Sequence, residues 1–83
     1  MRIQFHPDVL KQLQRLPREV FEAALQAIIA LAVEPRPVGA KKLVGGRDDW
    51  RIRLGQYRIV YQIDGSADMV TVYIVTKRSD AYR

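Results

Sequence analysis

A short stretch of the chain, WRIRLGQYRIVYQI at residues 50–63, contains three arginines and only one type of charge. Apolar and polar residues alternate on both sides of Gly55 and Gln56, which predicts two antiparallel strands joined by a two-residue turn that begins with glycine. The stretch therefore presents its cations at the regular spacing of a sheet surface. These cations are Arg51, Arg53 and Arg58.

Strand pairing would gather the three arginines on one face of the sheet. Counting outward from the turn places Arg53 opposite Arg58 and Arg51 opposite Val60. Like charges directly opposite each other destabilise a sheet, and a bound phosphate would relieve that repulsion, because guanidinium groups form bidentate hydrogen bonds with phosphate. Any one arginine alone fits an interpretation in which it points into water and its stem covers apolar surface. Three on one face favour a phosphate-binding surface.

The distribution of charge points in the same direction. The chain of 83 residues has a formal net charge of +5. Residues 36–63 hold seven basic and two acidic side chains, which accounts for the whole excess, whereas residues 1–35 and 64–83 are each balanced. Concentrated positive charge favours a polyanion such as nucleic acid, although charge alone fits a solubilising surface equally well. We expect four further cations to contact RNA: Lys41, Lys42, Arg47 and Arg83.

RNA offers a reaction that such a surface could promote. Its 2′-hydroxyl can attack the adjacent phosphate, and this step needs cations around the phosphate together with a proton donor and acceptor. Lys77, Arg78 and Tyr82 follow the last predicted strand, so they could reach the same face if that strand neighbours the arginines. His6, the only histidine, lies beside Pro7 at a predicted helix start and is expected to cap or pack rather than catalyse. The sequence has no cysteine and no motif typical of a metal site.

The elements that must position these residues follow from the periodicity of the chain. Apolar residues recur at helical spacing up to Pro17 and again after it, and the period changes to two from Trp50 onward. The resulting prediction is an α+β fold, in which an antiparallel sheet of about four strands is packed on one face by an N-terminal helical hairpin. We expect a single domain of residues 1–83. The predicted order is a strand at 2–5, helices ending before residue 17 and near residue 32, a loop at 34–46, and strands at 50–54, 57–63 and 69–76.

Composition argues against several other classes of protein. No apolar run approaches the ~20 residues needed to span a membrane, and the N-terminal residues lack the apolar core of a signal peptide. The absence of cysteine fits a reducing compartment. We therefore expect a cytoplasmic protein without a membrane partner.

Two segments resemble a known family: LVGGRDDWRIRLGQYRIVYQI, residues 43–63, and VTVYIVTKRSDAYR, residues 70–83. With the two predicted N-terminal helices, the chain is similar over nearly its whole length to the RelE/ParE superfamily of type II toxins. It looks more like the RelE branch, whose members are endoribonucleases that cut mRNA on ribosomes. The basic residues described above favour that branch, because the ParE branch, which poisons DNA gyrase, generally lacks them.

The resemblance implies a mechanism and assigns its parts. Cleavage would proceed by 2′-hydroxyl attack on the adjacent phosphate, without a metal or any other cofactor. Arg58, in the motif YRIVY, and Arg78, after the last strand, would stabilise the crowded phosphate. Tyr82 would stack on or orient the substrate base, or take part in proton transfer.

The chain departs from the usual RelE pattern at positions that bear on proton transfer. Arg51 and Arg53 stand where many relatives have lysines, and an arginine does not give up its proton, so neither is a general base. Lys77 stands where many relatives have histidine. The resemblance therefore leaves two candidate proton acceptors, Lys77, if neighbouring cations favour its neutral form, and Tyr82.

The resemblance also implies partners. They are a cognate antitoxin protein, mRNA in the ribosomal A site, and operator DNA only through the antitoxin. Two alternatives stay open. One is a ParE-like DNA gyrase inhibitor on the same fold, and the other is a non-catalytic module that binds RNA or its antitoxin.

Overall fold

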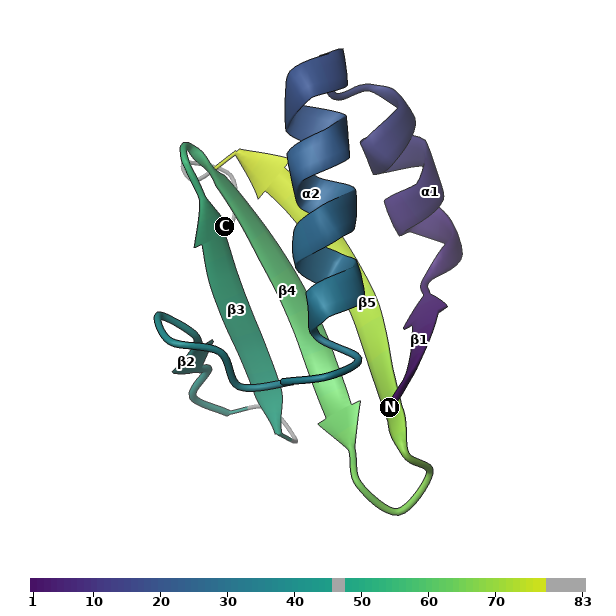
Figure 1. Cartoon of the computed structure of the whole chain (residues 1–83), viewed down its shortest axis with the longest axis vertical. Helices are drawn as coiled ribbons and strands as arrows, with labels where there is room; N and C mark the ends of the chain where they lie inside the picture. Colours follow the sequence, from purple (N-terminus) through teal and green to yellow (C-terminus); the bar gives the residue numbers. More distant parts are fainter. Residues whose placement is uncertain (46–47, 78–83) are drawn as a thin grey trace.

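A computed structural model of the protein describes residues 1–45 and 48–77. In these residues two helices and five strands follow one another along the chain (Figure 1). The elements are β1 (Arg2–Phe5), α1 (Pro7–Gln14), α2 (Arg18–Ala30), β2 (Lys41–Lys42), β3 (Asp49–Leu54), β4 (Tyr57–Asp64) and β5 (Met69–Lys77). The predicted α+β fold, with a helical hairpin on one face of a sheet, is confirmed.

Local sequence signals set the limits of the two helices. The Nδ1 atom of His6 accepts a hydrogen bond from the backbone N–H of Asp8 at 3.2 Å, which caps α1. Pro7 occupies the first turn of α1, where no backbone donor is needed. Pro17 separates the helices, because it lacks the N–H that a continuous helix would require. His6 is therefore a capping residue, as its position beside Pro7 predicted.

The five strands form one mixed sheet in the order β1-β5-β4-β3-β2. β1 pairs in parallel with β5, and the other neighbours are antiparallel. The expectation of about four antiparallel strands is corrected on both counts. β2 has two residues and lies in the segment predicted as a loop, because so short a strand gives no periodicity to detect. The parallel pairing of β1 is possible because two helices separate it in sequence from the rest of the sheet.

The β3–β4 hairpin has the predicted register. A two-residue turn begins with Gly55, which adopts a φ of +60°, a value that favours glycine. Arg53 lies opposite Arg58, and Arg51 lies opposite Val60. The alternate residues of both strands face the apolar core. All three arginines therefore share the face of the sheet that points away from the core.

Both helices pack on the same face of the sheet, as Figure 1 shows. The core lies between the helices and the sheet. Its buried residues are Val9, Leu13, Ala24, Ile28, Leu31, Ile52, Ile59, Tyr61, Ile63, Val70, Val72 and Val75. Because α1 and α2 lie on the core side, neither covers the arginine side of β3 and β4. Neither helix of the described chain is long and apolar enough to cross a membrane.

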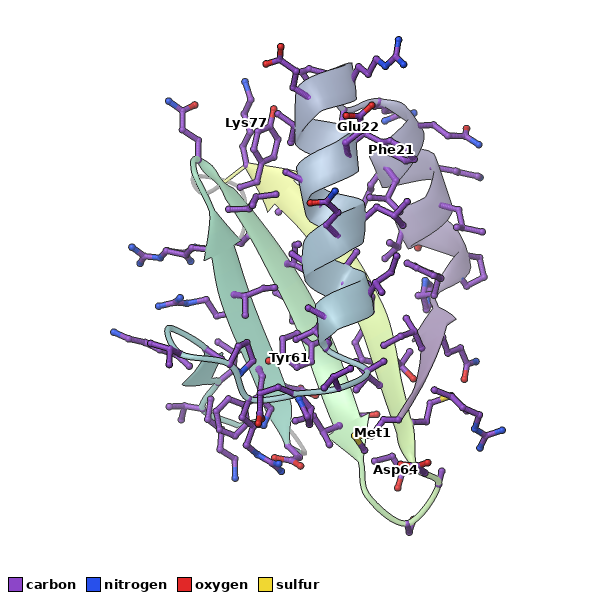
Figure 2. The ribbon with its side chains drawn as sticks, in the orientation of Figure 1. Met1, Phe21, Glu22, Tyr61, Asp64 and Lys77 are labelled. Carbon is purple, nitrogen blue, oxygen red and sulfur yellow. The ribbon has the colours of Figure 1, made fainter. Side chains whose placement is uncertain are left out.

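A buried tyrosine anchors the segment that leads from α2 to β2. The Tyr61 hydroxyl donates a hydrogen bond to the backbone carbonyl of Pro35 at 2.6 Å, and Figure 2 shows Tyr61 where that segment crosses the sheet. Burial raises the pKa of Tyr61 to about 12, so the hydroxyl stays protonated and can donate. Arg36, in the same segment, lies over the Trp50 ring with its guanidinium carbon 5.3 Å from the ring centroid. These contacts fix the path of the chain into β2.

Candidate active site

A groove of about 520 Å³ opens on the arginine side of the sheet, where β2, β3 and β4 are neighbours. Eight of the described residues line it, and five of these are basic. The lining residues are Lys41, Lys42, Leu43, Val44, Arg51, Arg53, Arg58 and Val60. We name it the basic groove. It brings together the three arginines of the β3–β4 hairpin and two of the four other cations that were predicted to contact RNA.

β2 extends the groove by adding a third strand of cations. Lys41 pairs with Arg51 across β2 and β3, and Arg53 pairs with Arg58 across β3 and β4. Two cation–cation pairs therefore lie on one face, where the sequence predicted one. Such pairs are unfavourable, and a bound phosphate would relieve both.

Burial separates the three arginines into two kinds. Arg58 is 2% exposed and Arg51 is 6% exposed, whereas Arg53 is exposed. Each of the two buried arginines has an interaction partner, as expected for charged groups that are shielded from water. The interpretation in which each arginine points into water therefore holds for Arg53 alone. Arg51 and Arg58 are held in place, and Arg53 is a side chain that a ligand could order.

Asp48 moderates the charge at one end of the basic groove. Its carboxylate oxygens lie 4.0 Å from Lys42 Nζ and 3.4 Å from Arg36 Nη2, and one of them accepts a hydrogen bond from Trp50 Nε1 at 2.8 Å. Lys42 is therefore partly neutralised. Lys41 and Arg53, by contrast, make no ion pair with any residue in the described part of the chain.

Lys77, the other predicted site residue in the described chain, does not line the basic groove. Lys77 ends β5 opposite Tyr57, a register that places both on the helix side of the sheet, and Figure 2 shows Lys77 at the end of the sheet near α2. Thr76 is the β5 residue that lies opposite Arg58. Four predicted site residues lie outside the described residues, and their roles stay predictions: Arg47, Arg78, Tyr82 and Arg83.

Sequence reasoning assigned no role to the apolar residues of the groove, which are Leu43, Val44 and Val60. The backbone N–H of Leu43 donates to the carbonyl of Asp49 at 2.8 Å and prolongs the pairing of β2 with β3. A signal for this arrangement was present, because Gly45 and Gly46 follow the two lysines and precede a strong strand pattern. Glycines in a short segment between two extended stretches are a sequence signal for a turn or loop.

The chemistry that the groove offers is recognition of negative charge. Within residues 1–45 and 48–77, no three His, Cys, Asp or Glu side chains gather into a possible metal site. The basic groove instead presents guanidinium and ammonium groups. Guanidinium forks can bind phosphate oxygens in pairs, and cations held by a sheet can stabilise charge that builds on a phosphate during a reaction.

Comparison with known proteins identifies the family. Residues 3–82 match the family described as ParE toxin of type II toxin-antitoxin system, parDE. The chain belongs to this family of type II toxins. The predicted membership of the RelE/ParE superfamily is confirmed, because the match covers nearly the whole toxin.

Several relatives of this toxin are RelE proteins. A RelE1 toxin of Methanocaldococcus jannaschii is 26% identical over 84 residues, which cover 98% of this chain and 93% of the relative. A chain of the archaeal RelE–RelB complex from Pyrococcus horikoshii is 30% identical, with a TM-score of 0.84 over 96% of this toxin and 97% of that chain. The isolated RelE toxin of E. coli is also 30% identical, with a TM-score of 0.81 over 98% of this toxin and 89% of that chain. The toxin is therefore RelE-like in sequence and in fold.

Proposed function

We propose that this toxin is an endoribonuclease that cuts mRNA in the ribosomal A site and so blocks translation. The observation that supports the proposal most is the two cation–cation pairs of the basic groove, Lys41 with Arg51 and Arg53 with Arg58. Cations at opposed positions of neighbouring strands repel each other, and a phosphate bound between them would reduce that repulsion. The similarity to RelE toxins supports RNA as the source of that phosphate.

In the proposed reaction the RNA supplies its own nucleophile. The 2′-hydroxyl oxygen loses its proton to a general base and attacks the adjacent phosphorus, while the bond from phosphorus to the 5′-oxygen breaks. The products are a 2′,3′-cyclic phosphate and a 5′-hydroxyl that takes up a proton. Arg51 and Arg58 would donate N–H groups to the phosphate oxygens as negative charge builds on them. This chemistry requires no metal ion.

Residues beyond the groove would complete the site. Arg78 would add a further cation at the phosphate, and Tyr82 would stack on a base or accept the proton. Because Lys77 lies on the helix side of the sheet, we favour Tyr82 over Lys77 as the proton acceptor. The cations that would hold flanking phosphates are Lys41, Lys42, Arg47 and Arg83.

We further propose that a cognate antitoxin holds the toxin inactive. RelE of Pyrococcus horikoshii was solved in a complex with RelB. By analogy, the antitoxin of this toxin would connect it to operator DNA, and release of the toxin would expose the basic groove. The free toxin would act in the cytoplasm, where ribosomes translate mRNA.

A second candidate function is inhibition of DNA gyrase, because the matching family is described as ParE toxins. Such a toxin would act by binding a protein, and its arginines would not need to contact RNA. The two candidates therefore differ in which macromolecule is damaged.

Cleavage mapping in a cell-free translation reaction separates the candidates. Purified toxin is added to a defined mRNA with and without ribosomes, and the cut sites are mapped by primer extension. The proposal expects cuts within the A-site codon only when ribosomes are present, with 2′,3′-cyclic phosphate ends. Intact mRNA together with inhibition of purified gyrase would instead establish the second candidate. Intact mRNA that is retained by the toxin in a filter-binding assay would indicate a non-catalytic RNA-binding module.

A further inference from the structure

A second groove, of about 450 Å³, adjoins the basic groove. It lies between α1 and the strands β4 and β5, and it also contacts the beginning of β3. Val60 lines both grooves, so the two meet on β4. The adjoining groove differs in character, because none of the described residues that line it is a lysine or an arginine.

Aromatic and apolar side chains give this groove surfaces on which a flat ring could stack. The rings of His6 and Tyr73 have centroids 6.1 Å apart and planes inclined by 42°. Val60 and Ile74 are cross-strand partners and supply apolar surface. A register shift after Val60 leaves Tyr73 without a partner in the strand ladder, and its hydroxyl donates to Gln62 Oε1 at 2.9 Å. Stacking on aromatic side chains is a common way in which proteins bind exposed bases of RNA.

One carboxylate oxygen of a residue that lines the same groove lacks a hydrogen-bond donor in the described chain. Asp49 lines the groove, and its Oδ1 atom is buried and has no hydrogen-bond partner among the residues that the structure describes. A buried acceptor without a partner is unfavourable. A ligand N–H group would satisfy it once a rotation of the Asp49 side chain brings the oxygen to the groove surface. His6 Nδ1 accepts from the backbone of Asp8, which assigns the proton of the neutral ring to Nε2, so the ring can donate on its other side.

We propose that this groove, which we name the base groove, binds an RNA base beside the phosphate that is cut, and that it prefers bases with an exocyclic amino group to uracil. The proposal rests on the proposed function, because it takes RNA as the ligand of the basic groove. Adenine, cytosine and guanine each offer an –NH₂ donor to Asp49. Uracil offers a single N–H between two carbonyl oxygens, which the carboxylate repels.

The neighbouring basic groove favours a nucleotide over other occupants. A nucleotide has a flat base and an anionic phosphate a few bonds apart. The base groove offers aromatic rings and an acceptor for the base, and it meets the cations of the basic groove at Val60. A lysine or arginine side chain of a protein partner would also satisfy Asp49 Oδ1. It would leave the stacking surfaces unused and would be repelled by the cations next to it.

Titration with two mononucleotides tests the base groove without requiring cleavage. ¹⁵N-labelled toxin is titrated with CMP and with UMP, which differ only at the part of the ring that would meet Asp49. We expect saturable chemical-shift changes at the amides of Asp49, Gln62 and Tyr73, with CMP binding about tenfold more tightly than UMP because of the extra hydrogen bond. Asp49→Asn should bring the two affinities together, because its amide offers uracil a donor. Asp68→Asn, the same change on an exposed turn, should keep the tenfold difference.

The outcomes separate this proposal from the function on which it rests. Equal binding of CMP and UMP by the wild-type toxin, or shifts confined to residues outside the groove, would overturn the base groove even if ribosome-bound mRNA is cut. A tenfold preference in a toxin that cuts no mRNA would support the base groove and contradict the proposed function. Shifts at these amides with a trilysine peptide, but with neither nucleotide, would overturn the proposal and assign the groove to a protein partner.

Discussion

Arg58 is the residue on which the proposed chemistry depends most. It lies on β4 between Arg53 on one neighbouring strand and Thr76 on the other, and it is 2% exposed. A guanidinium held in this way cannot turn freely, so it is oriented before the substrate arrives. Cations and donors fixed in advance are effective at stabilising charge that develops in a transition state.

Replacing Arg58 by alanine is expected to lower the rate of mRNA cleavage by about 100-fold or more, the usual cost of losing a donor to a developing oxyanion. Arg58→Lys should give an intermediate rate, because it keeps the charge but loses the bidentate fork. Single-turnover cleavage of ribosome-bound mRNA measures both rates. Because the side chain is buried, thermal unfolding must be followed in parallel. If Arg58→Ala does not fold, a folded Arg58→Lys variant with the full wild-type rate would contradict the assigned role.

At the scale of elements, the hairpin was predictable and its surroundings were not. A two-residue turn at Gly55 and a strict alternation fix which side chains face each other, so the partners of Arg51 and Arg53 followed by counting. The burial of Arg51 could not be predicted in the same way. Arg51 lies beside β2, a strand of two residues that has no periodic signal of its own.

The candidate site was likewise predicted in part. Lys41 was assigned to an RNA-contacting loop, and the structure places it in a strand opposite Arg51. Lys77 was expected to reach the arginine face if β5 neighboured the hairpin. β5 does lie beside β4, but its register turns Lys77 to the other side. The sequence pattern predicts which strands are neighbours more readily than it predicts their register. A shift of one residue in register moves every side chain of a strand to the opposite face of the sheet.

A charge reversal on β2 should have opposite effects on stability and activity. Lys41→Glu replaces a repulsive partner of Arg51 by an attractive one, so it should stabilise the toxin by about 0.2–1 kcal/mol. The same change places negative charge in the basic groove and should slow cleavage. Urea unfolding and single-turnover cleavage measure the two effects, with Lys41→Ala as the neutral comparison. A Lys41→Glu variant less stable than Lys41→Ala would contradict the cross-strand repulsion.

The Tyr61 anchor predicts a loss of stability at high pH. Burial raises the folded-state pKa to about 12, above the unfolded value of about 10. The folded state therefore holds this proton more tightly, and the resulting stability is fully present below pH 10 and is lost as the pH rises through 12. Tyr61→Phe should be less stable near pH 8 by about 1 kcal/mol, because the Pro35 carbonyl loses its donor. The difference in free energy of unfolding between the wild type and Tyr61→Phe, measured by urea unfolding from pH 8 to 11, should narrow as the pH rises. A constant difference would contradict the raised pKa of Tyr61 in the folded state.

At the scale of the whole molecule, charge and packing are divided between the two faces of one sheet. The helices bury the core on one side, and the excess positive charge lies between residues 36 and 63 on β2, β3, β4 and their connections. The toxin therefore needs few residues to combine a stable fold with a site that binds an anionic ligand. Stability comes from the helix side, and substitutions on the exposed part of the basic groove should leave it nearly unchanged.

The salt dependence of RNA binding should report this arrangement. Binding of a fluorescent, 2′-deoxy-blocked RNA oligonucleotide, measured by anisotropy at several salt concentrations, gives a slope that counts phosphate contacts. Removing one phosphate-contacting cation in Lys41→Ala should reduce the slope by about one. Arg18→Ala, on α2 and outside the lining of both grooves, should leave it unchanged. Equal slopes for Lys41→Ala and the wild type would mean that β2 does not contact the RNA backbone.

The most direct test of the basic groove as the active site compares two exposed arginines. Arg53 lines the groove, whereas Arg18 lies on α2 and pairs with Glu22. Replacing either by alanine should change the free energy of unfolding by no more than about 0.5 kcal/mol, so differences in cleavage would reflect function. We expect Arg53→Ala to cut ribosome-bound mRNA at least about tenfold more slowly than the wild type and Arg18→Ala to cut at the wild-type rate. Equal rates for Arg53→Ala and the wild type would contradict the assignment of the basic groove as the active site.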